Sequence, residues 1–274
     1  MHSQMERKQF GKKGIFLTFI AISLIAAFIL IFLPSNISLE KGIPVVKTRV
    51  TKINEYVVDL ENVYLERALQ SSGTKTVIAL TKYMQSQNKF LADFEDSFKE
   101  VLLQGTINGQ PIDSFIEPDI MAGNTYPDWL EKIKAAADNA FNANTNFGTI
   151  SLNNVEVYQT RPWFLAVEAN VSFTVSSETA SWKKNITVRS EIDIQNFNDP
   201  YYLVNTAGSY ANRINKSAVN FNEWNANKVR EHIRYGTYAH FEGGKAPSFI
   251  MRFTNTSLNS NCCGIESLVN PNKP

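Results

Sequence analysis

The sequence predicts an α+β fold: an N-terminal transmembrane helix, then amphipathic helices packed on an antiparallel β-meander of three to four strands. Three observations predict it. An apolar run lies near the N-terminus, apolar residues then recur at spacings of three and four, and rows of alternating apolar residues follow. The 274 residues are enough for one or two domains with a core of their own.

The apolar run covers residues 15–33 and is interrupted only by Thr18 and Ser23. A bilayer core about 30 Å thick needs roughly 20 helical residues, so the run is long enough to span it. Four basic residues precede the run, namely Arg7, Lys8, Lys12 and Lys13. Because a basic flank stays cytoplasmic, we predict a cytoplasmic segment (1–14) and an anchor (15–34) that contacts membrane lipid. The rest of this single-pass protein of the cell membrane is then extracytoplasmic.

A cleaved secretory signal is the alternative interpretation of the run. Such signals have apolar regions of about 7 to 15 residues and end at a small-x-small site. Here the run is longer and ends in Phe32-Leu33-Pro34-Ser35, without an Ala-x-Ala pattern. These features favour an anchor that stays on the chain.

The junction Lys12-Lys13-Gly14-Ile15 resembles the class III signal of archaeal and bacterial type IV pilin-like proteins. The resemblance implies that a dedicated peptidase cuts after Gly14 and that the apolar helix stays on the mature chain. It does not extend to filament assembly, because Phe19 stands where bacterial pilins carry Glu. Taken without the resemblance, the two lysines are a positive flank of the anchor.

Residues 35–145 are predicted to be helical. From Val50 to Tyr64, apolar residues recur at alternating steps of three and four, which places them on one stripe of a helix. We expect this helix to stop at Ser71-Ser72-Gly73 and a second one to follow. The second helix has a possible break near Gln87-Asn88.

Two further signals delimit this helical region. The second helix is expected to end at Gly105, before the turn-rich segment Asn108–Pro111. A third helix is indicated by Thr125-Tyr126-Pro127-Asp128, which supplies a cap, a first-turn proline and an acid near the helix N-terminus. Packing of these helices in a core is favoured over a coiled coil, because the runs are short and interrupted.

Residues 146–205 are predicted to form the antiparallel β-meander. One alternating apolar row runs from Trp163 to Val175 and a second from Trp182 to Ile194, which is the period of half-buried strands. We expect a preceding strand from Ile150 to Val157 and a short fourth strand at Tyr202–Val204. One-sided alternation with short connections favours a meander, and the amphipathic helices would cover its apolar face.

Residues 206–274 are predicted to be an irregular α/β extension. Within it, Trp224–Tyr235 is expected to form a helix and Phe249–Phe253 a strand. The chain then ends in Asn270–Pro274, a composition that predicts little packing.

Several segments extend the resemblance to single-pass surface proteins of archaea with pilin-type N-termini. The segments are Pro162-Trp163, Ser181-Trp182, Asp199–Val204, Ala246–Phe249 and Gly264–Val269. The resemblance implies a location and an architecture, and it implies no activity. Members often continue beyond a segment like Gly264–Val269, so it also implies that this chain is a truncated or short version.

The charge balance argues against a nucleic-acid partner. The chain has 27 basic and 26 acidic residues, and beyond Gly14 it has 23 basic and 25 acidic ones. Phosphate-binding proteins show a basic excess, whereas a balanced surface has no strong field to attract polyanions. The partners we expect are a second copy of the chain or other surface proteins.

Five N-x-Ser/Thr triplets are candidate glycosylation sites, at Asn36, Asn170, Asn185, Asn215 and Asn255. Asn170 and Asn185 fall on the polar faces of their predicted strands and would point to water, where a glycan must lie. We expect at least one of the five to be modified in a host that glycosylates its exterior. Unmodified polar strand faces are the alternative.

Cys262 and Cys263 are the two cysteines of the chain, and they are adjacent. An ordinary disulfide joins Cα atoms roughly 4.4 to 6.8 Å apart, which neighbours reach only with backbone distortion. A vicinal disulfide, a bridge to another chain and free thiols all remain open. An oxidising exterior adds weight to an interchain bridge, and a structural or interchain role is favoured over redox catalysis.

No motif in the sequence predicts catalysis, a cofactor or a metal. His232 and His240 have Glu231 and Glu242 beside them, but they do not match a His-Glu-x-x-His site. No Gly-x-Ser-x-Gly segment is present. We therefore expect no catalytic, metal-binding or cofactor-binding residue in this chain.

The leading functional hypothesis is a non-catalytic, membrane-anchored, extracytoplasmic and pilin-like surface protein that makes protein–protein or surface contacts. The alternative is a membrane-anchored extracellular hydrolase acting on glycans or peptides, because glycosidase carboxylate pairs are set by the fold and not by sequence spacing. A receptor's sensory head is disfavoured, since the segment before the anchor is too short for an output module.

Overall fold

A computed structural model of the chain describes Ser23 and residues 46–178, 180–218, 225–240, 246–256 and 260–267. Within these ranges, none of the helices has both the length and the apolarity needed to cross a membrane. The predicted anchor at residues 15–33 lies outside the described residues, Ser23 excepted, and so does the junction Lys12–Ile15.

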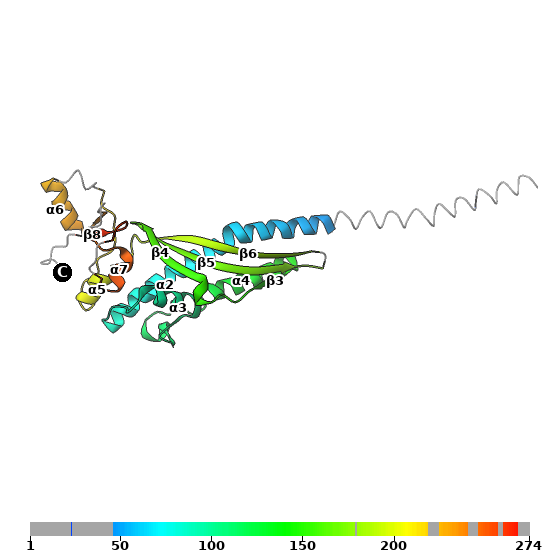
Figure 1. The fold of residues 1–274 in the computed structure, drawn as a ribbon, viewed down its shortest axis with the longest axis horizontal. Coiled ribbons are helices and arrows are strands. Elements are labelled where there is room, and N and C mark those ends of the chain that lie inside the picture. The colour runs from blue at the N-terminus through cyan, green and yellow to red at the C-terminus, as the bar shows by residue number, and fades with distance from the viewer. Residues whose placement is uncertain are drawn as a thin grey trace, which may run out of the picture. The chain divides into compact units, whose positions relative to one another are not determined.

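The chain divides into two units, residues 1–54 and 55–274. In the first unit, residues 46–54 are helical. The second unit is an α+β structure with an antiparallel sheet, which confirms the predicted fold class at that level (Figure 1).

The helices of the second unit are of α, 3-10 and π type. They are residues 55–59, η1 (Leu60–Tyr64), α2 (Leu65–Gln87), α3 (Phe94–Gln104), η2 (Ile112–Phe115), α4 (Tyr126–Phe141), η3 (Leu152–Asn154), α5 (Pro200–Asn205), α6 (Ala226–Tyr235) and α7 (Phe249–Phe253). The strands are β1 (Thr106–Ile107), β2 (Gln110–Pro111), β3 (Asn144–Phe147), β4 (Val155–Arg161), β5 (Phe164–Ser176), β6 (Ser181–Asp193), β7 (Tyr238–His240) and β8 (Ile265–Ser267).

The main sheet is built around β5. Strand β6 pairs with it antiparallel along its whole length, with Val171 opposite Ile186. On the other edge, β4 pairs with the first half of β5 and β3 pairs with its last four residues. Because β4, β5 and β6 follow one another in the chain, they form the predicted meander, and β3 adds a fourth strand.

The strand that precedes β5 is shorter than predicted. It was expected from Ile150, but β4 begins only at Val155. Residues Leu152–Asn154 instead form a single 3-10 turn, in which the Asn154 side chain accepts hydrogen bonds from Ser151. Apolar spacing of two residues was a false signal there, because this polar capping interaction fixes the turn.

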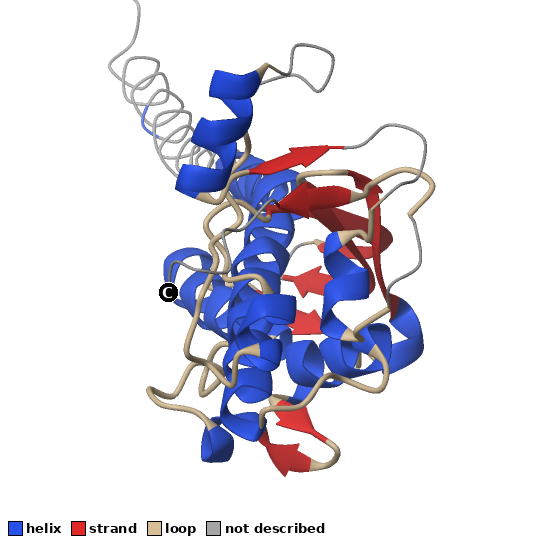
Figure 2. Ribbon diagram, turned by 90° about the vertical axis from the view of Figure 1, so that its left-hand side faces the viewer, coloured by secondary structure: helices blue, strands red, loops and turns tan. Residues whose placement is uncertain are grey.

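One face of the main sheet is apolar and is covered by helices. Alternate residues of β5 from Leu165 to Val175 are buried, which confirms the predicted row. Helix α2 lies against β6, α3 against β4 and α4 against β3. Figure 2 shows these helices as a layer beside the strands. The opposite face carries the exposed Asn170 and Asn185 into solvent.

Helix α2 passes without interruption through Ser71-Ser72-Gly73, so the stop predicted there is wrong. Gly73 lies directly against β6: a Cβ atom on it would be 2.7 Å from Cδ1 of Ile192. The glycine therefore serves close packing of the helix on the sheet, despite its cost of about 1 kcal/mol relative to Ala within a helix. The predicted break is confirmed, because α2 ends at Gln87 with Asn88 in the left-handed conformation.

Helix α3 ends and helix α4 begins at the predicted signals, whereas the Asp93 cap of α3 was not predicted. The Asp93 carboxylate accepts the Asp96 amide at the start of α3, which ends at Gly105 with φ of 67°. Thr125 and Asp128 form a reciprocal capping box at the start of α4, and a proline lies in the first turn. These caps satisfy backbone groups that a helix terminus leaves without partners.

The C-terminal segment (residues 195–267) differs most from the sequence predictions. Tyr202–Val204 lie in helix α5 and not in a fourth strand, because Asp199 caps the helix and Pro200 occupies its first position. Phe249–Phe253 form helix α7 and not a strand, with Ser248 as the cap. The predicted C-terminal helix is confirmed as α6. Figure 1 shows α5, α6, α7 and β8 gathered near the end of α2.

Candidate functional site

A buried ion pair lies at the centre of the C-terminal segment. The Arg252 Nη1 atom donates to the Asp199 Oδ2 atom over 2.6 Å, and their side chains are 4% and 0% exposed. Asp199 caps α5 and Arg252 comes from α7, so the pair joins two short helices that the sequence separates widely. Buried charges require such pairing, because an isolated charge in the interior is very costly.

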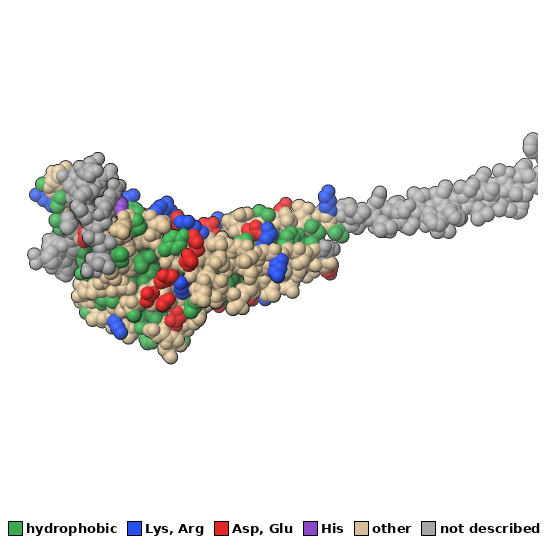
Figure 3. Space-filling view, viewed as in Figure 1, with side chains coloured by type: hydrophobic (Ala, Val, Ile, Leu, Met, Phe, Trp, Pro, Cys, Tyr) green, Lys and Arg blue, Asp and Glu red, His purple; other side chains and the backbone are tan. Residues whose placement is uncertain are grey.

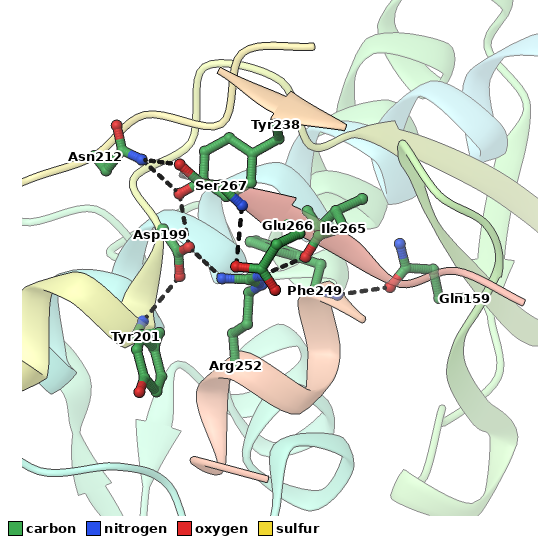
Figure 4. A network of polar contacts seen from close by, with 10 residues as sticks. All are labelled: Gln159, Asp199, Tyr201, Asn212, Tyr238, Phe249, Arg252, Ile265, Glu266 and Ser267. Carbon is green, nitrogen blue, oxygen red and sulfur yellow. Dashed lines mark hydrogen bonds and ion pairs between the residues drawn. The ribbon is translucent and has the colours of Figure 1, made fainter. Parts of the chain in front are cut away.

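Further polar side chains complete a network around this pair (Figure 4). The Tyr238 hydroxyl, from β7, donates to Asp199 Oδ2 over 2.7 Å. The Asn212 amide donates to the Tyr238 oxygen over 2.9 Å and to the Ser267 hydroxyl over 3.1 Å. Arg252 Nη2 also donates to the carbonyl of Ile265 in β8. The network therefore joins α5, α7, β7 and β8.

The chemistry of this network is structural. Asp199 Oδ1 accepts the Tyr201 amide over 2.9 Å, while Oδ2 accepts Tyr238 and Arg252. Burial raises the pKa of Tyr238, and the negative charge of Asp199 raises it further. Burial by itself lowers the pKa of Arg252, but the negative charge of Asp199 and the smaller contributions of Tyr238, Glu266 and Tyr202 together raise it, so the net direction is upward. Both partners keep their protons, so both oxygens of the Asp199 carboxylate accept hydrogen bonds.

Gln159 in β4 connects this segment to the main sheet. Its Oε1 atom accepts the Phe249 amide over 3.2 Å, and its Nε2 atom donates to the carbonyl of Pro162 over 2.9 Å. Its own carbonyl oxygen contacts the sulfur atoms of Cys262 and Cys263 at 3.5 and 3.4 Å. The C-terminal segment is thus held against β4 by a side chain and by a sulfur contact.

The two cysteines are bonded to each other. Their Cα atoms are 3.8 Å apart, as in adjacent residues, and the sequence separation is one. Cys262 is exposed, whereas Cys263 is fully buried and its amide donates to the Ser260 hydroxyl. Of the three alternatives that the sequence left open, the structure has the vicinal disulfide, in which neither sulfur is free to bridge to another chain.

Two of the described glycosylation candidates, Asn170 and Asn185, lie close together on the outer face of the β5–β6 pair, because Asn170 is opposite Thr187 and Asn185 is opposite Ser172. Asn170, Asn185, Asn215 and Asn255 are all exposed. The Asn170 Oδ1 atom accepts the Thr187 hydroxyl across the β5–β6 pair over 2.7 Å. Asn36 lies outside the described residues. The four described asparagines are therefore accessible, and two of them share the outer face of the main sheet.

The two histidines of the C-terminal segment have separate structural partners. The Nδ1 atom of His232 is 2.6 Å from the Thr237 hydroxyl, and burial lowers the pKa of this histidine. The Nδ1 atom of His240 is 2.9 Å from the carbonyl of Gly264. In the part of the chain that the structure describes, no group of three or more His, Cys, Asp or Glu residues could hold a metal ion.

The outer face of the main sheet carries a ladder of charges. Glu168 pairs with Arg189 over 3.6 Å and accepts the Tyr158 hydroxyl over 2.5 Å. Glu191 pairs with Arg161 and, over 3.7 Å, with Arg189. Acidic and basic side chains are likewise interspersed on the face drawn in Figure 3. Exposed pairs of this kind contribute little to stability.

A shallow hollow of about 440 Å³ lies where this ladder meets α2. Two carboxylate residues, Glu66 and Glu191, line it together with Gln70, Phe164 and Arg189. The Gln70 side chain donates to the backbone carbonyl of Glu191 over 2.8 Å and closes one side. Sequence reasoning missed this hollow, because it depends on the register of β6 against the helix.

Of the five segments quoted for the resemblance to archaeal surface proteins, the three nearest the C-terminus meet in space, whereas Ser181-Trp182 lies at the far end of the β5–β6 pair. Asp199 opens one of them and holds Arg252, three residues beyond Ala246–Phe249. The Ile265 amide donates to the Pro247 carbonyl over 3.1 Å. A Cβ atom on Gly264 would lie 2.3 Å from the Ala246 carbonyl oxygen, so this approach requires glycine. These three segments therefore lie at or beside the buried network, to which Asn212, Tyr238 and Arg252 also contribute. No family model, curated protein or solved structure was found to match this chain.

Proposed function

We propose that this chain is a non-catalytic, membrane-anchored, extracytoplasmic and pilin-like surface protein whose folded unit makes protein–protein or surface contacts. The observation that carries the proposal is the apolar run at residues 15–33, preceded by Lys12-Lys13-Gly14 and followed by an α+β unit. In this proposal the run is a transmembrane helix, residues 1–14 are cytoplasmic and cleavage follows Gly14.

Features of the second unit support an extracytoplasmic location. The four described sequon asparagines are exposed, as glycan attachment requires. The cysteine pair is oxidised, which is typical of proteins outside the reducing cytosol. The charges of the outer sheet face are paired with one another, as on a surface that contacts proteins without a strong single-sign field.

Protease shaving of intact cells tests the orientation. We expect fragments of residues 55–267 to be released from intact cells, and the chain to need detergent for extraction. Survival of the folded unit in intact cells, with digestion only after lysis, would contradict the orientation. Solubility without detergent would contradict the anchor.

Mass spectrometry of the native N-terminus tests the pilin-like part separately. A mature chain beginning at Ile15 is expected, and Gly14→Leu is expected to block the cleavage and leave the anchor intact. The control is Gly11→Leu, which changes a glycine of the same basic segment away from the junction. A native chain that still begins at Met1 would leave an anchored protein without pilin-type processing.

An anchored hydrolase acting on glycans is the second candidate, and the hollow between Glu66 and Glu191 is the observation that favours it. Glycosidases use two carboxylates on opposite sides of the scissile bond. Against it, the Glu191 carboxylate is engaged by Arg161 and Arg189, whereas a general acid must carry a proton to donate. Hydrolysis of oligosaccharides by the full chain, lost in Glu66→Gln and Glu191→Gln, would establish this second function.

A further inference from the structure

A second hollow, of about 320 Å³, lies between α2 and the beginning of the C-terminal segment. Its lining residues come from α2, from the chain that leaves β6 and from the chain that returns after α5. The segment after β6 and the segment after α5 lie side by side. Asn198 and Arg213 form a backbone bridge, and the Asp199 amide donates to the Asn212 carbonyl. The buried network just beyond this bridge fixes the same residues. Backbone hydrogen bonds therefore hold together the two segments that line one side of the hollow.

The hollow is cationic. Lys82 and Arg213 line it, and none of the described residues that line it carries a carboxylate. The Lys82 ammonium donates to the neutral backbone carbonyl of Glu117 over 2.8 Å, and within the described part of the chain it has no ion-pair partner. Arg213 is exposed, and within the described part of the chain its guanidinium has no ion-pair partner. Two positive charges without an acid favour an anionic ligand.

Amide side chains and one aromatic ring supply the rest of the lining. Gln85, Asn196 and Asn198 each offer a donor and an acceptor, which is what neighbouring hydroxyl groups need. Phe197 is half-buried and stacks on Phe249, with ring centroids 6.4 Å apart and planes 14° apart. The ring thus presents a fixed apolar surface beside the amides.

From this combination we propose that the hollow binds an acidic saccharide, with the carboxylate of a hexuronate residue at Arg213 and Lys82. The ring hydroxyls pair with the amides, and the apolar face of the sugar lies on Phe197. The volume is at the lower end of the range for small-ligand sites, about 300–1,000 Å³, which fits one or two sugar rings. The proposal requires no catalysis and does not depend on the anchor or on processing after Gly14.

The hollow at Glu66 and Glu191 serves as an internal control for binding at the hollow beside Arg213. It is larger, but its two carboxylates would repel an acidic sugar, whereas the hollow at Arg213 has no such group among its described lining residues. Binding that is lost on changes at Arg213 and unaffected at Glu66 would locate the site.

Calorimetric titration of the full-length chain in detergent micelles tests the proposal. The ligands are galacturonate, its methyl ester, acetate and an acidic peptide. We expect galacturonate to bind at least about tenfold more tightly than the neutral ester, because the charged hydrogen bonds are lost with the ester. It should also bind more tightly than acetate, which lacks the ring. Equal binding of the acid and the ester, or of acetate and galacturonate, would overturn the proposal, as would tighter binding of an acidic peptide.

Three variants locate the site on the chain. Arg213→Gln is expected to weaken galacturonate binding by about tenfold or more, with no effect on the ester. Asn196→Gly removes an amide and suits the backbone, because Asn196 has φ of 68°, so weaker binding without unfolding is expected. The control Arg67→Gln changes an exposed arginine of α2 outside the hollow and should bind as the unmodified chain does. Unchanged binding in both hollow variants would overturn the assignment.

Discussion

The main sheet with its helices and the C-terminal segment are held together by different means. In the sheet, alternate side chains of β5 and β6 bury apolar area beneath α2, and these contacts are numerous and individually replaceable. In the C-terminal segment, four short elements meet around one buried ion pair between Asp199 and Arg252. The stability of the sheet region is spread over many apolar contacts, whereas that of the C-terminal segment depends on a single ion pair.

This difference determines how each region should respond to substitution. Removal of one apolar group from the sheet leaves a cavity whose cost depends on local relaxation. Removal of one partner of a buried pair leaves an uncompensated charge, and that cost falls on every element the pair joins. The C-terminal segment is therefore the region in which a single substitution can detach a whole unit of structure.

Arg252→Met should have the largest effect of any single change considered. It leaves the Asp199 carboxylate fully buried without its cation, which costs about 3–5 kcal/mol. We expect hydrogen exchange to become fast in β7 and β8 while β5 and β6 keep their protection. If β5 and β6 lost their protection together with β7 and β8, the two regions would not be separate units of stability.

Asp199→Asn in the Arg252→Met background is the matched control. The amide oxygen can replace Oδ1 and accept the Tyr201 amide, while the NH2 group replaces Oδ2 and can donate to the Tyr238 oxygen, so the side chain stays hydrogen-bonded but carries no charge. The double variant should recover much of the lost free energy of unfolding, because the cost of the single change lies in the unpaired charge. Equal instability of both variants would show that the shape of Arg252 matters and not its charge.

The contrast also explains what could be predicted from the sequence. The strands from Trp163 to Val175 and from Trp182 to Ile194 can be predicted from the sequence, because each has its own alternation of apolar and polar residues. Phe249–Phe253 carries no such information: five mainly apolar residues fit a strand or a helix, and here the Ser248 cap makes a helix. The partner of Arg252 lies 53 residues away, so only the fold brings the pair together.

Gly73→Ala tests the sheet region and should have a smaller effect. The new Cβ atom would lie 2.7 Å from Cδ1 of Ile192, and overpacking of a core costs about 1–3 kcal/mol. The higher helix propensity of Ala, worth about 1 kcal/mol, offsets part of this. Thermal denaturation should show a modest fall in melting temperature, with a single transition.

Ile192→Val removes the methyl group that the new Cβ atom would strike, so it provides the matched test. By itself this change should cost about 0.5–1.5 kcal/mol. Combined with Gly73→Ala, it should give a protein more stable than additivity predicts, since the two side chains share one space. Arg67→Ala on the exposed side of α2 should change stability by less than about 0.5 kcal/mol. Strict additivity would mean that α2 does not pack on β6 through Gly73.

The glycine at position 73 also shows where sequence reasoning failed within the well-patterned region. Ser71-Ser72-Gly73 has the composition of a helix end, and an isolated helix could end there. In the folded protein, Ser72 and Gly73 are both buried, and the missing side chain of Gly73 permits close contact with Ile192 of the sheet. Tertiary packing therefore keeps α2 helical at a site where local propensity favours a helix end. The apolar pattern of the helix alone does not indicate this packing.

The titration of His232 should have the smallest effect on the free energy of unfolding, and the direction of its pH dependence follows directly from its burial. It is 3% exposed in α6, and burial lowers its pKa below the ordinary value of about 6.5. Below pH 6.5 the unfolded chain therefore binds a proton that the folded chain does not, so the free energy of unfolding falls as the pH falls. The loss cannot exceed about 1.4 kcal/mol per pH unit for one proton. Denaturation at pH 7.5 and 5.5 should show a smaller difference in His232→Gln, which does not titrate but can still contact Thr237, and an unchanged difference would assign the effect to other groups.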